Sequence, residues 1–301
     1  MRFERLALIG CGLMGGSFAL ALRQAGAVAQ VAGFSASEAT RRKALAMGVI
    51  DLACSSAAEA VQGADLVLLA VPVGATEATL RAIDGQHLPH ALVMDVGSTK
   101  GDVVAAARAA LPRSLPCFVP AHPIAGKEVA GIEHADATLY RDRQVILTPL
   151  PENPIERVLQ AHQLWQLLGS RVLELTPQAH DASFAAVSHL PHLTAFALVN
   201  AVARQADGAR HLAMAGPGFR DFSRIAASDP HVWRDILLAN RDEVLRQSAQ
   251  LRAALDELEA AMRDGDGPRL QALIHEASQT RSQWRLNGAD HAPPPSRPLA
   301  D

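Results

Sequence analysis

The stretch LALIGCGLMGGSFALAL, residues 6–22, decides the fold of this chain. A short apolar run leads into three glycines in the spacing GxGxxG, and a helical period follows directly. In such a loop the first glycine makes a tight turn, the second lets a pyrophosphate approach the backbone, and the third lets helix and strand pack. A glycine-rich turn is the plainer interpretation, but strand, loop and helix N-terminus occur together here, which predicts dinucleotide binding. The residues expected to contact the cofactor in this loop are Gly10, Gly12, Leu13, Met14 and Gly15.

Short apolar runs alternate with helical periods up to about residue 175. Continuous apolar runs are typical of strands in a parallel sheet that is covered on both faces. We therefore predict an α/β fold whose N-terminal domain, 1–175, is a Rossmann-type doubly wound sheet. The predicted strands are 6–10, 31–34, 64–72, 91–97, 117–121, 143–149 and 171–177, and helices are expected at 14–26 and 98–111.

The strand pattern ends at Thr176, and an all-helical domain, 176–287, is expected to follow. The longest helix opens with Asp229 as a plausible N-cap and Pro230 at the first helical position. A helix of that length outruns a small monomeric domain, so we predict a homodimer built through the helical domain. The proline-rich tail, 288–301, is expected to be disordered. The expected helices are 178–206, 218–227, 230–263 and 268–285.

Composition excludes several classes of protein. The 301 residues are 49% hydrophobic and 20% charged, with a net charge of −3 and no basic run for nucleic acid. Cys11, Cys54 and Cys117 lack a CxxC spacing and indicate reduced core cysteines of a cytoplasmic protein. The N-terminus runs straight into a strand, and no apolar run reaches the roughly 18 residues of a membrane helix. We expect neither a signal peptide nor a membrane partner.

The end of the second predicted strand bears on the choice of cofactor. An acidic residue there would hydrogen-bond the ribose 2′-hydroxyl of NAD, but the chain reads GFSAS, residues 33–37. Ser35 and Ser37 can donate to a 2′-phosphate, and Arg41 can pair with it. Solvated side chains on a surface helix are the alternative interpretation. The pattern favours NADP over NAD.

Three further strand ends should carry the chemistry, because ligands sit at the carboxyl ends of strands in open α/β sheets. Val71 and Pro72 can line the ribose and nicotinamide side of the cofactor. Ser98 stands at a strand-to-helix junction, where it can cap the helix, orient a ligand, or do both. His122 lies in VPAHPIAG, residues 119–126, on a loop that two prolines stiffen. A neutral imidazole there can accept a proton from a substrate hydroxyl while hydride leaves the same carbon.

In order along residues 5–245, the chain resembles the prephenate/arogenate (cyclohexadienyl) dehydrogenases of tyrosine biosynthesis. The resemblance rests on GCGLMGGSFALAL, DVGSTKG, AHPIAGKEVAGI, HDASFAAVSHLPH and GPGFRDFSRIAASDPHVW. It implies that hydride passes from the substrate ring to NAD(P) while the ring carboxylate leaves as CO₂. His122 matches the family's catalytic histidine, and Ser98 matches the serine that assists it.

The resemblance also implies a set of substrate contacts. Arg224 matches the arginine that holds a substrate carboxylate, as a guanidinium fork can, and Arg220 stands four residues earlier. His192 is expected to contact substrate and Trp233 to pack near it, although a core tryptophan is equally consistent with the pattern. Asp181 resembles the acid of arogenate-accepting members, so the sequence leaves prephenate and arogenate both open.

Two other functions compete with this one. A β-hydroxyacid dehydrogenase would use a catalytic lysine in the helical half, and residues 176–301 contain no lysine. A non-catalytic NADP-sensing module would bind cofactor without turnover. His189 and His192 stand in HLPH, which lacks the third ligand of a zinc helix, so no metal site is predicted. The roles of His180 and His189, and feedback by tyrosine, stay open.

Overall fold

The computed structural model describes residues 1–284 except 87, 89 and 128, so the predicted tail 288–301 lies outside the described residues. Contacts divide the chain into two compact units, residues 1–245 and the part that begins at Arg246. The boundary predicted at 175/176 falls inside the first unit and stays a prediction. The second unit holds most of one long helix and the helix that follows it.

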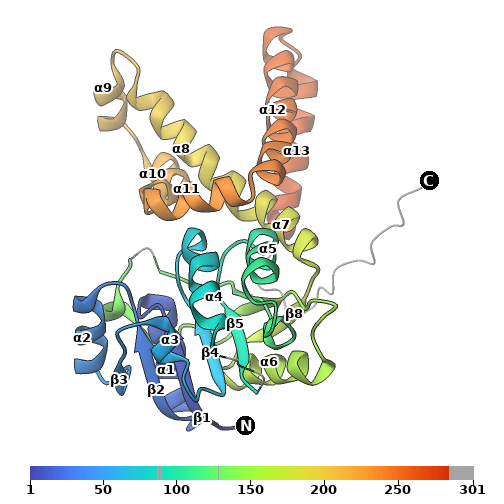
Figure 1. Ribbon diagram of the computed structural model, residues 1–301. Helices are drawn as coiled ribbons and strands as arrows, with labels where there is room; N and C mark the ends of the chain where they lie inside the picture. Colours follow the sequence, from blue (N-terminus) through green and yellow to red (C-terminus); the bar gives the residue numbers. More distant parts are fainter. Residues whose placement is uncertain (87, 89, 128, 285–301) are drawn as a thin grey trace. The chain divides into compact units, whose positions relative to one another are not determined.

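The N-terminal part of the first unit is a five-stranded parallel sheet in the order β3-β2-β1-β4-β5 (Figure 1). The fold class predicted from sequence is confirmed, and only the two-residue β3 lacked a predicted counterpart. The strands are β1 (Phe3–Ile9), β2 (Val28–Phe34), β3 (Leu52–Ala53), β4 (Leu66–Leu69) and β5 (Leu92–Asp95). The helices between and after them are α1 (Leu13–Gln24), α2 (Glu38–Ala46), α3 (Ala57–Ala60), α4 (Thr76–Asp84) and α5 (Gly101–Ala110).

Two separate apolar clusters explain why the strands read as unbroken apolar runs. Leu6 and Leu8 of β1 belong to the cluster on one face of the sheet, and Ala7 and Ile9 belong to the other. Successive side chains of a strand point to opposite faces, so covering both faces removes the need for polar positions. All four side chains are fully buried.

A second, three-stranded sheet corrects one part of the prediction. Strand β6 (Ala121–Pro123) pairs antiparallel with β7 (Gln144–Leu147), and β7 pairs parallel with β8 (Arg171–Glu174), with α6 (Ile155–Leu167) between them. The strand predicted at 117–121 begins only at Ala121, because a 3₁₀ turn occupies Leu115–Cys117. A single parallel bridge between Val93 and Phe118 joins this segment to β5.

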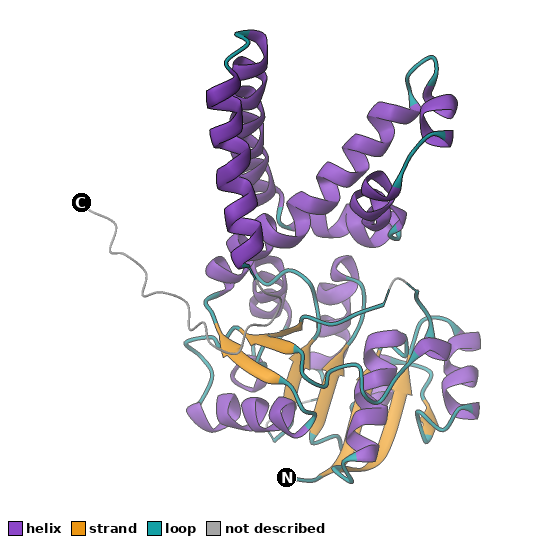
Figure 2. Cartoon of the chain, turned by 180° about the vertical axis from the view of Figure 1, so that it is seen from behind, coloured by secondary structure: helices purple, strands orange, loops and turns teal. Residues whose placement is uncertain are grey.

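Strand β8 is the last strand of the described chain, and helices follow it (Figure 2). The predicted helix 178–206 contains a π-helical turn, Ala185–His189, between α7 and α8. The predicted helix 230–263 is broken at Asn240 into α11 and α12, while Asp229 caps α11 through the N–H groups of His231 and Val232. Helix α9 was missed. The helices are α7 (Pro177–Phe184), α8 (Leu190–Ala203), α9 (Gly208–Ala213), α10 (Pro217–Ser223), α11 (Pro230–Ala239), α12 (Arg241–Arg263) and α13 (Gly267–Gln283).

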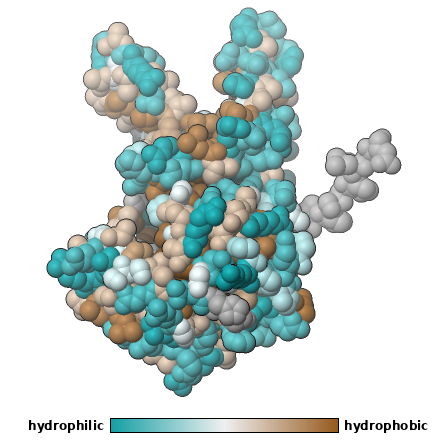
Figure 3. Space-filling view, in the orientation of Figure 1, coloured by the Kyte–Doolittle hydropathy of each residue, from teal (hydrophilic) through white to brown (hydrophobic). Residues whose placement is uncertain are grey.

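One observation contradicts the expectation that no segment is apolar enough to cross a membrane. Residues Pro177–Ala203 form one helix of 27 residues whose most apolar window has a mean hydropathy of 1.3, with 17% of that window buried. Core helices of water-soluble proteins meet the same test of length and composition. Figure 3 shows tan and brown side chains at the surface of the arm that carries α8 and α9. An exposed apolar surface of this kind is typical of a face that another molecule covers.

Candidate active site

The glycine loop has the geometry that a dinucleotide requires. Gly10 has φ +104°, and a Cβ there would lie 2.2 Å from the carbonyl oxygen of Ala70. A Cβ at Gly15 would lie 2.8 Å from Leu8 Cδ1, so only glycine lets α1 pack this closely on β1. Above Gly12, by contrast, no described atom lies within 4 Å, and the N-terminus of α1 carries no side-chain cap among the described residues. The open space and N–H donors fit a pyrophosphate.

Arg41 of α2 is held at the carboxyl end of β2. The Arg41 guanidinium donates to the carbonyl oxygens of Ser35 and Ala36, and it lies 5.7 Å from the centre of the Phe34 ring. The Ser37 hydroxyl oxygen accepts the N–H of Thr40 and caps α2. Because these contacts hold Arg41 beside the strand end, its charge faces the place where the ribose of a dinucleotide binds in this fold.

The end of β4 lies against the glycine loop. A Cβ at Gly10 would reach within 3.1 Å of the backbone nitrogen of Val71, which identifies the two segments as neighbours. Val71 is half-buried and Pro72 is exposed, and the short 3₁₀ helix Val73–Ala75 follows them and contacts α11. These residues therefore stand at the cofactor edge of the sheet, as their sequence position predicts.

A buried ion pair joins the ends of β5 and β6. Lys100 Nζ donates to Asp95 Oδ2 over 2.5 Å, and the two side chains are 0% and 4% exposed. The same carboxylate accepts the N–H of Gly97 at 2.7 Å and the N–H of Ala121 at 3.0 Å. Gly97 precedes Ser98 and Ala121 precedes His122, so Asp95 fixes both backbone segments.

Ser98 itself is half-buried, and it does not cap the following helix. Helix α5 begins at Gly101, where the carboxylate of Asp181 receives the N–H groups of Lys100 at 2.8 Å and Gly101 at 2.7 Å. The capping role considered for Ser98 is therefore wrong, because a residue from α7 takes it. This leaves the Ser98 hydroxyl out of helix capping.

His122 lies in a row of hydrogen-bonded side chains. Its Nδ1 is 2.8 Å from Nε2 of His180, and Nδ1 of His180 is 2.8 Å from Oδ1 of Asp181. The rings of His122 and His180 meet edge to face at 5.0 Å, and the Phe184 ring packs on both. His180 and Asp181 are buried, with 0% and 8% of their surface exposed. The row connects β6 to α7 and, through Asp181, to α5.

The surroundings keep these histidines neutral at physiological pH. Burial, then the nearby His180, Lys100 and His189, lowers the pKa of His122 well below its usual value. Burial also lowers the pKa of His180, against the opposing effect of Asp181. Burial alone would raise the pKa of Asp181, but hydrogen bonds from His180 and the α5 backbone outweigh it and hold that pKa below normal. The row thus carries an ionised carboxylate and neutral rings.

A second cluster continues from the same helix. His192 stacks on Trp233 with ring centres 3.5 Å apart and an angle of 19°, and Phe196 packs against both rings. The Asn240 amide donates to the backbone carbonyl of Asp181 at 2.8 Å and to His189 Nδ1 at 3.2 Å. His189 is 1% exposed, and burial lowers its pKa to about 4. Asn240, at the break between α11 and α12, therefore links His189 to the row of Asp181, His180 and His122.

The two arginines predicted to bind substrate are both exposed. Arg220, in α10, forms an ion pair with its neighbour Asp221 over 3.0 Å, and both side chains are more than 70% exposed. Arg224 begins a 3₁₀ helix, Arg224–Ala227, that packs against α8. Both segments contact α8, the helix that carries His192: α10 with Arg220 and the 3₁₀ helix with Arg224. Their substrate roles stay predictions.

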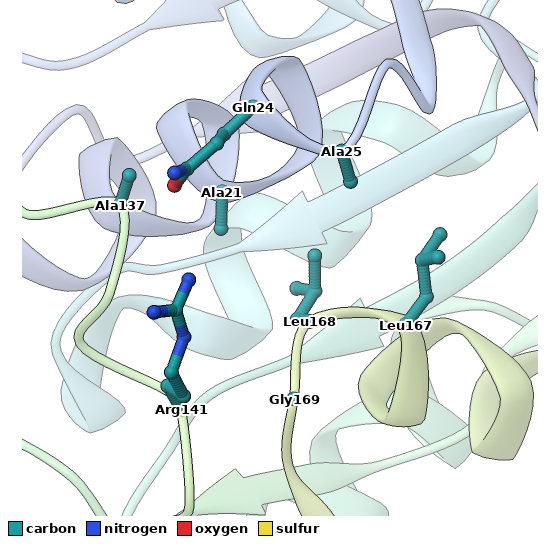
Figure 4. A pocket seen from close by; sticks show the side chains of 8 residues that line it. All are labelled: Ala21, Gln24, Ala25, Ala137, Arg141, Leu167, Leu168 and Gly169. Carbon is teal, nitrogen blue, oxygen red and sulfur yellow. The ribbon is translucent and has the colours of Figure 1, made fainter.

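No metal cluster among the described residues and no cavity beside α1 offers a better site. Among the described residues, no group of three or more His, Cys, Asp or Glu side chains could hold a metal ion. A cavity of about 230 Å³ is lined mostly by apolar side chains of α1, the 137–141 loop and the end of α6 (Figure 4). Gln24 and Arg141 supply its polar groups. It lies by the C-terminus of α1, at the edge of the sheet opposite the glycine loop, where ligands of this fold do not bind.

Sequence reasoning missed four residues of the site: Asp95, Lys100, His180 as a ring partner, and Asn240. The signals were present, since Asp95 and Lys100 share DVGSTKG with Ser98, and His180 precedes Asp181. What the sequence could not supply was the pairing, because His122 and His180 are 58 residues apart.

Comparison with known proteins agrees with this geometry. Residues 18–174 match the model of the prephenate dehydrogenase nucleotide-binding domain, and residues 176–276 match that of the prephenate dehydrogenase dimerization domain. A cyclohexadienyl dehydrogenase from Zymomonas mobilis is 33% identical over 281 residues, which cover 93% of this chain and 95% of the relative.

Two solved structures extend the likeness to the whole fold. A prephenate dehydrogenase from A. aeolicus, in complex with hydroxyphenyl propionate and NAD+, superposes with a TM-score of 0.85 at 32% identity, over 94% of this chain and 99% of that one. A Synechocystis arogenate dehydrogenase has a TM-score of 0.80 at 28% identity, over 93% and 99% of the two chains. Both matched domains correspond, and the chain belongs to the prephenate dehydrogenase family.

Proposed function

We propose that this protein catalyses the NAD(P)-dependent oxidative decarboxylation of prephenate, arogenate or both, giving 4-hydroxyphenylpyruvate or tyrosine in tyrosine biosynthesis. Family membership supports the reaction class. The observation that carries the proposal is the 2.8 Å contact between His122 Nδ1 and His180, which leaves the second ring nitrogen of His122 for a substrate hydroxyl.

In the proposed reaction, Nε2 of His122 accepts the proton of the hydroxyl on ring carbon C4. The O–H electron pair forms the new carbonyl bond as hydride leaves C4. When the ring carboxylate leaves as CO₂, the electron pair of its C–C bond restores aromaticity and returns to the oxygen, which takes the proton back from His122 to give the phenol. NAD(P), when bound, supplies the hydride acceptor. Gly10, Gly12, Leu13, Met14 and Gly15 hold its pyrophosphate, and Val71, Pro72 and Ser98 border its nicotinamide side. A base already neutral at pH 7 suits this step, because it can take the proton without first losing one.

Substrate binding is assigned to the helical side of the site. Either substrate carries two carboxylates, which a guanidinium can bind, and Arg224 is the first choice for a carboxylate with Arg220 as a secondary contact. His192 and Trp233 form an aromatic platform whose flat faces suit a six-membered ring. The sequence offers Asp181 as a partner for the ammonium group of arogenate. Its carboxylate already receives three hydrogen bonds, which an ammonium group would have to displace.

For the cofactor, we propose NADP as the preferred form. Arg41 supports this choice because its guanidinium is held at the end of β2, with Ser35 and Ser37 beside it and no carboxylate between residues 33 and 37. An acid at this position would repel a 2′-phosphate. NAD stays the alternative, which the A. aeolicus relative binds.

We also propose a homodimer through the helical domain. The description of the matched domain as a dimerization domain supports it, and so does the apolar, mostly unburied helix Pro177–Ala203. Exposed apolar side chains such as Val187, Met214 and Phe222 lie on it or on the helices near it. A second copy would remove this surface from water. The cytoplasm is the proposed compartment, in keeping with three buried cysteines that form no disulfide.

The proposal is tested by mixing the pure protein with prephenate or arogenate and with NAD or NADP, and following absorbance of the reduced cofactor. We expect turnover with at least one of the four pairings, and no turnover with any of them would refute the function. Cofactor binding without turnover would identify a sensing module, and turnover of a β-hydroxyacid instead would identify that alternative.

Two variants test the assigned residues. His122→Asn should keep cofactor affinity but lose most of kcat, since the ring nitrogen that accepts the proton is gone. Arg224→Ala should mainly raise KM for the substrate. If His122→Asn turned over like the wild type, the role of His122 would be wrong.

A further inference from the structure

The row formed by Asp181, His180 and His122 invites a question that the reaction alone does not answer: which nitrogen of His122 carries the proton. We propose that Asp181 and His180 are positioning residues that hold His122 in the tautomer with Nδ1 protonated and Nε2 free. This inference rests on the proposed function, and its first test below does not depend on turnover.

The protonation pattern follows from the donors and acceptors, starting at the carboxylate. An ionised Asp181 can only accept, so Nδ1 of His180 must donate to it across 2.8 Å. A neutral His180 then has only a lone pair at Nε2. Nδ1 of His122, 2.8 Å away, must therefore donate to that lone pair. In a neutral imidazole one nitrogen donates and the other accepts, so Nε2 of His122 becomes the acceptor.

The start of this row is fixed more firmly than a surface carboxylate could be. Asp181 accepts the N–H groups of Lys100 and Gly101 at the N-terminus of α5, whose dipole favours the charged form. Asn240 donates to the backbone carbonyl of the same residue. With 8% of its surface exposed, Asp181 has little freedom to rotate toward a ligand. The carboxylate therefore imposes one direction on both histidines.

The same row suits the charge that the reaction creates. When the substrate O–H breaks and an N–H forms at Nε2, His122 becomes an imidazolium whose Nδ1–H still donates to His180. Lys100 opposes positive charge on both rings, whereas Asp181 and Asp95 favour it on His180, the hydrogen-bonded partner of His122. His180 links the new positive charge to Asp181 through two hydrogen bonds. The electron pair of the broken O–H bond stays with the substrate, and the oxidation is the accompanying loss of hydride from C4 to NAD(P).

An opposing idea gives Asp181 to the substrate, as a partner for the ammonium group of arogenate. The two ideas differ in what the carboxylate touches. Its Oδ1 contacts the Lys100 N–H and His180, and its Oδ2 contacts the Gly101 N–H. An ammonium would have to displace one of these donors. The geometry therefore favours a role through His122 that is the same for every substrate.

The first test reads the tautomer directly. In protein labelled with ¹⁵N-histidine, the His122 resonances are identified by their loss in His122→Asn. We expect Nδ1 of wild-type His122 to appear protonated and Nε2 unprotonated at pH 7.5. The reverse pattern in the wild type would overturn the proposal, whether or not the protein turns over prephenate or arogenate.

The second test separates positioning from folding. In His180→Gln the amide oxygen can still accept from His122 Nδ1, whereas His180→Leu removes the acceptor. We expect His180→Leu to lose the Nδ1-protonated signal and to lower kcat by about 10- to 100-fold, the range seen when residues that orient a functional histidine are removed. His180→Gln should recover most of that loss. Equal kcat in the two variants would contradict the proposal.

Two controls complete the design. Val158→Ala removes buried volume from α6, away from the site, and should lower the midpoint of unfolding without changing kcat or the tautomer. Asp181→Asn should lower kcat by the same factor for each substrate that the wild type accepts, with KM unchanged. A rise in KM confined to arogenate would instead show that Asp181 binds the ammonium group.

Discussion

Acid should destabilise this protein in a way that can be traced to one side chain, His189. The ring is 1% exposed, and burial lowers its pKa to about 4, against about 6.5 in the unfolded chain. Asn240 donates to its Nδ1, so protonation at that nitrogen would break the hydrogen bond. As pH falls, the unfolded state therefore binds this proton at a higher pH than the folded state does, and the free energy of unfolding decreases.

The size of the effect follows from the two pKa values. The stabilisation that depends on a neutral His189 is fully present above about pH 6.5. It has fallen by about 2 kcal/mol at pH 5, and it levels off below about pH 4 after a loss of roughly 3 kcal/mol. His189→Asn keeps an oxygen acceptor for Asn240 but cannot titrate. The free energy of unfolding, measured with urea at pH 8, 6.5 and 5, should thus fall about 2 kcal/mol further in the wild type than in the variant. Parallel pH profiles of the two proteins would refute the reasoning.

Three other predictions concern the cofactor edge. Lys100→Met leaves the buried Asp95 carboxylate without its cation, so urea unfolding should show a loss of roughly 3–5 kcal/mol, and a loss below about 1 kcal/mol would mean that backbone donors suffice. A Cβ added in Gly12→Ala meets no described atom within 4 Å, so the protein should fold normally. Its affinity for NADP, measured by fluorescence titration, should fall at least about tenfold, because the methyl group occupies the place of the pyrophosphate. Unchanged affinity would show that the loop does not bind the cofactor. Arg41→Ala should raise KM for NADP by about 10- to 100-fold, which corresponds to the loss of one charge-assisted hydrogen bond. KM for NAD should stay nearly unchanged. Equal changes for both cofactors would show that Arg41 does not bind the 2′-phosphate.

The parts of the fold that sequence predicted are those governed by neighbours along the chain. The loop from Gly10 to Gly15, the alternation of strands and helices, and the cap at Asp229 all depend on a few consecutive residues. Other features depend on distant contacts. Nothing local marks Asn240 as a helix break, because its side chain is bonded to Asp181 and His189, 59 and 51 residues earlier.

The site divides in the same way. Ser98 follows β5 and His122 follows a predicted strand end, so the rule that ligands bind at carboxyl ends of strands could single them out, although the structure places His122 within β6 of the second sheet. Asp181 was singled out too, but for a substrate contact, since its sequence position shows neither the N-terminus of α5 nor His180 beside His122. Burial decides these roles, and burial is a property of the folded chain. The sequence shows which groups can act, whereas the fold determines which of them meet.

The π-helical turn Ala185–His189 gives the long helix one residue more than a regular α-helix would need for the same rotation. An α-helix turns by about 100° and rises by about 1.5 Å for each residue. Deleting one residue from the turn, such as the 72% exposed Val187, would restore ordinary α-helical geometry. The π-helical turn already accommodates one extra residue, so this deletion would leave the half of the helix that carries His192 at nearly the same rotation relative to the half that carries His180. In a regular α-helical segment, the loss of one residue rotates everything that follows by about 100°. Position 187 is therefore a place where a three-nucleotide deletion would preserve the alignment of the base with the aromatic platform.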